Sequence, residues 1–141
     1  MKSRSVLTIV LLFASVVLLP ATLQSQVGKQ FLFRVNIPFE FVAGDAHLPA
    51  GGYSVFRLAA PDVLLVESDK NPGSAVVLVQ QFETGQSSHV NKLVFNQYGD
   101  QSFLAEVWTS SDGLVHTALK SHQEVLAARK ALREERVLAV R

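Results

Sequence analysis

Histidines have the broadest chemistry of the residues in this chain, because imidazole binds metals and transfers protons near neutral pH. The chain has four of them, at positions His47, His89, His116 and His122. None belongs to an H-x-H or H-E-x-x-H pattern, the spacings that bring two imidazoles to one metal ion. His47 is the most interesting, because it lies in a turn before Leu48-Pro49. We interpret all four as isolated residues, and a metal site assembled from distant strands stays open.

Carboxylates are the second group with chemical potential. Asp45, Asp100 and Asp112 each lie beside a glycine, where a carboxylate binds calcium or bonds its own backbone in a turn. They do not follow a D-x-D-x-D-G loop, so turn chemistry is the simpler interpretation. Glu40 and Glu106 could form a carboxylate pair of the kind used by glycoside hydrolases. Both lie in or beside predicted strands, where outward positions are the default.

Nucleophile and cofactor motifs are absent from the sequence. There is no G-x-S-x-G, S-x-x-K, P-loop or G-x-G-x-x-G pattern. The chain also has no cysteine, which excludes disulfides, thiolate metal sites and lipoprotein acylation. We therefore predict no catalytic residue, no metal ligand, no cofactor and no enzymatic activity. A site assembled from loops is the enzymatic alternative.

Three aromatic residues near predicted turns are candidates for binding rather than catalysis. Tyr53, Tyr98 and Trp108 each combine an apolar ring with a polar group. If exposed, they would form a contact surface for a protein or a carbohydrate, since such residues often anchor interfaces. Packing in or beside the core is the alternative for each of them.

The elements that position these residues are predicted to be strands. Every second residue from Phe31 to Phe41 is apolar, which predicts a strand with an aromatic-rich face on the core. Pro38 cannot donate a ladder hydrogen bond, so we expect an edge strand or a bend that splits the run. Turn signals recur along residues 26–118, without βαβ alternation or repeats. We predict an all-β domain there, an antiparallel sandwich or partly closed barrel of about seven to eight strands.

The two ends of the chain differ from this domain. Lys2 and Arg4 precede the apolar run Val6–Leu19 and a small, polar region, which predicts a signal peptide over residues 1–25. The run is shorter than a spanning helix, which needs about 20 apolar residues. We therefore expect export to the periplasm, outer envelope or exterior. An uncleaved N-terminal anchor, which would place the protein at a membrane, is the alternative.

Residues 119–141 are predicted to form a C-terminal helix. Gln123–Val140 contains no glycine or proline and is rich in helix formers, and Ser121 with Glu124 makes a capping box. This tail is mildly basic and the preceding domain mildly acidic, which is typical of a solvated helix face. An oligomer or partner contact through the helix is the alternative. Neither charge is large enough to predict nucleic-acid binding.

Three motifs carry a family resemblance. They are F-x-V-N-I-P-F-E-F-x-A-G from Phe33, L-P-A-G-x-Y-x-V from Leu48 and F-N-x-Y-G-D-Q-x-F-L-x-x-V-W from Phe95. Together with the leader they resemble a group of small exported bacterial proteins of unknown function. The resemblance implies export and a β fold, and it brings no activity. The second motif also looks like the turn-to-strand step of prealbumin-like surface modules.

The function predicted from these observations is a non-catalytic binding or structural module of the cell envelope or exterior. Its partner would be a protein, a glycan or a small apolar ligand. This prediction rests on the leader, the missing catalytic motifs and fold-level analogy. A β-barrel carrier of a small apolar ligand is the alternative, and it requires an internal cavity.

Overall fold

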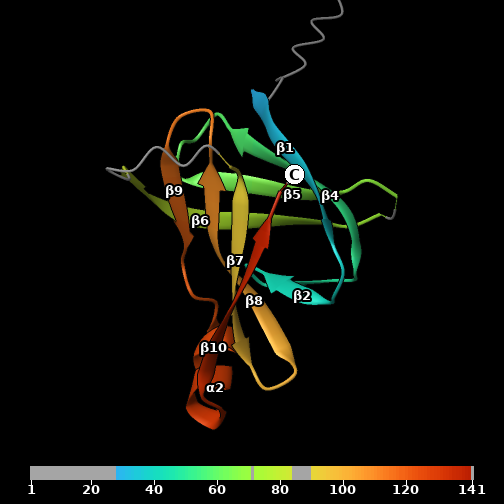
Figure 1. Cartoon of the computed structure of the whole chain (residues 1–141), viewed down its shortest axis with the longest axis vertical. Helices are drawn as coiled ribbons and strands as arrows, with labels where there is room; N and C mark the ends of the chain where they lie inside the picture. Colours follow the sequence, from blue (N-terminus) through green and yellow to red (C-terminus); the bar gives the residue numbers. More distant parts are fainter. Residues whose placement is uncertain (1–27, 71, 84–89, 141) are drawn as a thin grey trace, which may run out of the picture.

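A computed structural model describes residues 28–70, 72–83 and 90–140 of the chain (Figure 1). The described residues form ten strands and one helix, which confirms the predicted all-β class with a C-terminal helix. The predicted signal peptide, residues 1–25, and His89 lie outside the described residues. Among the described residues, no helix is long and apolar enough to cross a bilayer.

The elements follow one another along the chain as short strands joined by turns. They are β1 (Lys29–Ile37), β2 (Phe41–Ala43), β3 (Ala46–Leu48), β4 (Gly51–Leu58), β5 (Val63–Ser68), β6 (Ser74–Glu83), β7 (Lys92–Tyr98), β8 (Gln101–Thr109), β9 (Leu114–Ala118), α2 (His122–Lys130) and β10 (Arg133–Ala139).

Two sheet layers enclose the core. The first layer has the order β1-β4-β5-β6, and the second continues from β6 through β9 and β8 to β7 and β10, with the β2–β3 hairpin beside β8. Strand β6 belongs to both layers, because residues 74–78 pair with β5 and residues 79–83 pair with β9. In Figure 1 the strands β4 and β5 run across the direction of β7. The sheet does not close, so of the two predicted architectures the structure agrees with the sandwich.

The core is made by alternating residues of nearly every strand, as the period-two pattern requires. Its buried side chains are Phe33, Val35, Ile37, Phe41, Ala43, Leu48, Tyr53, Val55, Leu64, Val66, Ala75, Val77, Val79, Leu93, Phe95, Leu104 and Val107. Phe95 lies at its centre, in edge-to-face contact with Phe39 at 5.1 Å and Phe41 at 5.6 Å between ring centroids.

The aromatic run splits at Pro38, as predicted, into β1 and β2. The prediction that Phe31 faces the core is wrong, because its side chain is 54% exposed. A register shift between Phe31 and Phe33 in the β1–β4 pair explains the difference. An irregularity of one residue turns every residue beyond it to the other face of the strand.

The predicted C-terminal helix begins as expected and ends early. The backbone N–H of Glu124 donates to Ser121 Oγ at 3.2 Å, so Ser121 caps the helix. However, α2 ends at Lys130, and β10 pairs antiparallel with β7 over its whole length. The predicted extent of the helix, residues 119–141, is therefore wrong, since residues 133–139 form a strand. Seven cross-strand residue pairs outweigh a helix propensity of only tenths of a kcal/mol per residue.

Candidate functional site

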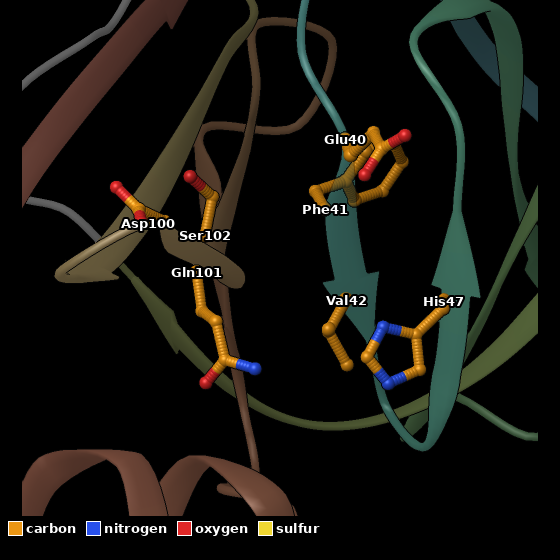
Figure 2. Close-up of a pocket in the computed structure, with 7 residues that line it drawn as sticks. All are labelled: Glu40, Phe41, Val42, His47, Asp100, Gln101 and Ser102. Atoms are coloured by element: carbon orange, nitrogen blue, oxygen red, sulfur yellow. The ribbon is translucent and has the colours of Figure 1, made fainter.

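A polar hollow of about 150 Å³ lies between the β2–β3 hairpin and the β7–β8 turn (Figure 2). Its lining residues are Glu40, Phe41, Val42, His47, Asp100, Gln101 and Ser102. In Figure 2 Glu40 and His47 come from one wall, and Asp100, Gln101 and Ser102 come from the other. His47 Nε2 lies 2.8 Å from Gln123 Oε1 of α2, which makes this imidazole a contact between the hairpin and the helix.

Metal-ligating side chains are not gathered here or elsewhere in the described part of the chain, where no group of three His, Asp or Glu could hold an ion. Of the three aspartates considered for calcium, Asp45 lies in the β2–β3 turn, Asp100 in the β7–β8 turn and Asp112 in the β8–β9 turn. The two glutamates considered as a catalytic pair line different hollows, Glu40 this one and Glu106 another on the β7–β8 surface.

Sequence reasoning missed a polar cluster around the buried His116. The Arg57 guanidinium forms an ion pair with Asp112, and its Nη2 lies 3.3 Å from Nε2 of His116, which has no exposed surface. A guanidinium only donates, so Nε2 accepts and the ring proton lies on Nδ1, which has no partner. The cluster joins β4 to the β8–β9 hairpin.

The cluster shifts the pKa of two of its members. Burial lowers the pKa of the His116 imidazole, the Arg57 cation lowers it further, and the Asp112 carboxylate opposes both. Burial works to raise the pKa of Asp112, but hydrogen bonds from Thr109, Arg57 and the Leu114 N–H outweigh it, so this pKa is lowered. His116 is therefore a buried neutral imidazole beside the Arg57–Asp112 ion pair.

Tyr53 and Tyr98 are packed inside the molecule. Tyr53 is fully buried, its hydroxyl donates to the Pro49 carbonyl at 2.6 Å, and burial raises its pKa. The Tyr98 hydroxyl lies 3.4 Å from Glu124 Oε1, in the small core under α2. Both tyrosines are therefore packed in the core, as the alternative interpretation expected, and neither offers a contact surface.

Trp108 is half-buried, and both its indole N–H and its ring contact neighbouring side chains. Its indole N–H donates to Glu106 Oε2 at 2.7 Å, and Lys92 Nζ lies 3.6 Å from the ring centroid. The three aromatic candidates therefore do not form one contact surface.

An apolar surface on the outside of the first layer is the feature that sequence reasoning did not find. Cross-strand pairs connect Phe31 to Phe56, Phe56 to Leu65 and Leu65 to Val76, so one apolar row crosses all four strands. A second row contains Val63 and its partner Leu78. We define the apolar face as Phe31, Phe56, Leu58, Val63, Leu65, Val76, Leu78 and Leu119.

The apolar face is open to solvent at its two edges. Phe31 on β1 is 54% exposed, and on β6 Val76 is 58% and Leu78 55% exposed. The backbone N–H of Leu119 donates to the Leu78 carbonyl at 2.9 Å, which holds Leu119 at the β6 edge. The sequence run AVVLV could have indicated this face. In it Val76 and Leu78 alternate with the buried residues of β6 and point outwards.

A hollow of about 470 Å³ borders the β6 edge of the apolar face. Its lining residues are Gly44, Asp45, Val76, Leu78, Leu119, Lys120 and Ser121. Gly44 has a φ of 58°, and a Cβ there would lie 2.7 Å from the Val76 carbonyl oxygen. The β2–β3 turn therefore lies directly against β6 and forms one wall of the hollow.

Comparison of the chain with protein-family models, with curated proteins and with solved structures finds no match in any of the three.

Proposed function

We propose that this chain is an exported, non-catalytic binding module of the cell envelope or exterior, and that it binds a protein partner through the apolar face. The observation that carries the proposal is the contiguous apolar row from Phe31 to Val76 on the outside of a sandwich. The largest apolar patch on the surface of a soluble protein is often a contact surface.

The composition of the surface favours a protein over the other partner classes. A glycan site would need exposed aromatic rings with polar groups, and Tyr53 and Tyr98 are buried. A carrier would need an internal cavity, whereas buried side chains from both layers occupy the space between the sheets. An aliphatic and phenylalanine surface is suited to the apolar centre of a protein interface.

Export is the part of the proposal that rests on the sequence alone. A basic start, an apolar run and a polar region precede Lys29. The three motifs quoted above resemble small exported bacterial proteins. A surface that binds a protein in the envelope is compatible with both observations.

Site-specific photo-cross-linking in an exporting bacterium tests the proposal. A benzophenone amino acid at position 78 lies on the apolar face, and the same residue at position 132 is the matched control. Leu132 is apolar and 91% exposed, but it lies outside the face. We expect protein adducts from position 78 that are missing from position 132. Equal adducts from both positions, or none from either, would contradict the proposal.

A further inference from the structure

We infer that a second site on this chain binds a small zwitterion, a molecule of the amino-acid class that carries both an ammonium and a carboxylate group. The site is a hollow of about 210 Å³ on the outer surface of the second layer, beside the first turn of α2. None of its lining residues belongs to the apolar face, so the inference goes beyond the proposed function. The residues that line it are Val94, Asn96, Ala105, Glu106, Thr117, Ala118, Lys120, Glu124, Arg133 and Glu135.

The floor of the hollow is a patch of four neighbouring strands, β10, β7, β8 and β9. Glu135 of β10 pairs with Asn96 of β7. Glu106 of β8 pairs with Val94 of β7 on one side and with Thr117 of β9 on the other. Residues directly opposite each other in an antiparallel pair present their side chains on the same face of the sheet. The register of the second layer therefore gathers these side chains into one hollow.

A β-bulge on β8 shapes this floor. In the pairing of β7 with β8 the register shifts between Val94 and Phe95, which leaves Ala105 as the extra residue of β8. Neighbouring residues of a regular strand point to opposite faces, but here Ala105 and Glu106 both line the hollow. A bulge re-aims side chains in this way, and it places a small apolar residue beside a carboxylate.

Glu124 of α2 is the acidic group of the hollow that lacks a counter-ion. It is only 4% exposed, and its Oε1 takes the contacts with Asn96 Nδ2 and the Tyr98 hydroxyl. Within the part of the chain that the structure describes, Glu124 forms no ion pair, and its Oε2 accepts no hydrogen bond. A buried charge is costly unless a group of opposite charge compensates it. An ammonium group of a ligand in the hollow would compensate this carboxylate at Oε2.

Lys120 and Arg133 form the basic side of the same hollow. Lys120 precedes α2 and Arg133 begins β10, so the helix and the strand after it bring the two cations to one place. Both residues are exposed, and neither forms an ion pair with another described residue. A guanidinium binds a carboxylate with two parallel hydrogen bonds, and an ammonium adds a compact charge. Both cations are therefore available to a carboxylate of the ligand.

The charges and the size of the hollow define the class of ligand. Three carboxylates and two cations line it, so a simple anion or a simple cation would meet charges of its own sign. A zwitterion has a partner for each of its charges. The hollow is also smaller than pockets for drug-sized molecules, which measure about 300–1,000 Å³. A small molecule that carries both charges, such as an α-amino acid, is therefore the class that fits.

Titration of the isotope-labelled exported chain with L-alanine, followed by the NMR shifts of its backbone amides, tests the inference. L-Alanine has the two charged groups and only a methyl group besides. We expect saturable shifts in the residues that line the hollow, with a Kd on the order of 1 mM, because partly exposed ion pairs contribute modestly. Propanoate lacks the ammonium and ethylammonium lacks the carboxylate, so each should bind about tenfold more weakly or less.

Charge-removing variants assign the two sides of the site. Glu124→Gln keeps an oxygen for Asn96 and Tyr98 and removes the charge, so it should weaken L-alanine binding about tenfold while the fold is retained. Arg133→Gln should weaken it to a similar extent from the basic side. Arg129→Gln is the matched control, because Arg129 is an exposed cation in the last turn of α2 that does not line the hollow. This control should bind L-alanine like the parent chain.

Thermal unfolding of each variant separates loss of the site from loss of the fold. Three results would overturn the inference: no saturable shifts with L-alanine, shifts confined to residues outside the hollow, or binding of propanoate or ethylammonium as strong as that of L-alanine. Unchanged binding of L-alanine in a folded Glu124→Gln variant would also overturn it, because the buried carboxylate would then not be the partner of the ammonium group.

Discussion

His116 lies beside the Arg57–Asp112 ion pair, without contact with solvent. Arg57 approaches its Nε2, and Asp112 completes the ion pair. Burial of an imidazole beside a cation favours its neutral form. This arrangement acts on stability, because protonation of the buried ring would place two positive charges side by side.

We predict that this chain loses stability as the pH falls below the ordinary pKa of histidine, 6.5. The pKa of His116 is lower in the folded state, so the unfolded chain binds more protons between the two values. The free energy of unfolding then falls by at most about 1.4 kcal/mol per pH unit for this group. Urea unfolding between pH 7.5 and pH 5 measures this pH dependence of the free energy of unfolding.

The variant His116→Gln should remove this part of the pH dependence, whereas His47→Gln should retain it. Asp112 affects stability over a separate, more acidic pH range. Its pKa is lowered in the folded state, so the stability that it adds is lost only when the pH falls below the ordinary aspartate pKa of 3.8. An unchanged slope in His116→Gln would show that the imidazole is not the responsible group.

Gly44 and Gly99 form a second test at the residue scale. Both have a positive φ, 58° and 60°, but only a Cβ at Gly44 meets the backbone, whereas Gly99 faces open space. We predict that alanine at either position costs about 1 kcal/mol for the left-handed conformation. Gly44→Ala should lose about 1–3 kcal/mol more through the clash with Val76. Equal losses in chemical denaturation would contradict the close approach of the turn to β6.

At the scale of elements, α2 contacts the second layer through a buried carboxylate, in addition to the contact between Gln123 and His47. Glu124 is almost fully buried, and its Oε1 accepts from Asn96 Nδ2 at 2.8 Å and lies 3.4 Å from the Tyr98 hydroxyl. Ala127 adds the apolar part of the contact. A short helix with so few contacts depends on each of them.

We predict that Glu124→Ala lowers the free energy of unfolding by about 1–3 kcal/mol, because it leaves the buried Asn96 amide without its acceptor. Amide hydrogen exchange should show that protection is lost first in residues 122–130. Glu134→Ala on the exposed face of β10 is the control and should change stability by less than about 0.5 kcal/mol. Similar losses in the two variants would refute the anchoring role.

At the scale of the whole molecule, the first sheet has two apolar faces with different roles. Leu64 points into the core and is fully buried, whereas Leu78 points outwards and is 55% exposed. We predict that Leu64→Ala costs about 2–5 kcal/mol, and that Leu78→Lys changes monomer stability by less than about 0.5 kcal/mol. Urea unfolding measures both. A large loss in Leu78→Lys would show that the outer face stabilises the fold.

Local pattern was sufficient for much of this architecture. Strict alternation around Phe33, Val35 and Ile37 predicted a core strand, and Pro38 predicted its interruption. Ser121 predicted the start of the helix. These features depend on residues within a few positions of each other, so the sequence alone determined them.

Tertiary structure decided the features that depend on residues far apart in the chain. The register shift that exposes Phe31, the pairing of β10 with β7 and the enclosure of His116 by Arg57 each join segments distant in sequence. When both faces of a strand are apolar, the period-two pattern of its residues does not indicate which face is covered by another layer. Whether Val76 faces a core or solvent is set by the layer packed against it, and only the assembled sheets show that its side of the sandwich is left uncovered within one chain.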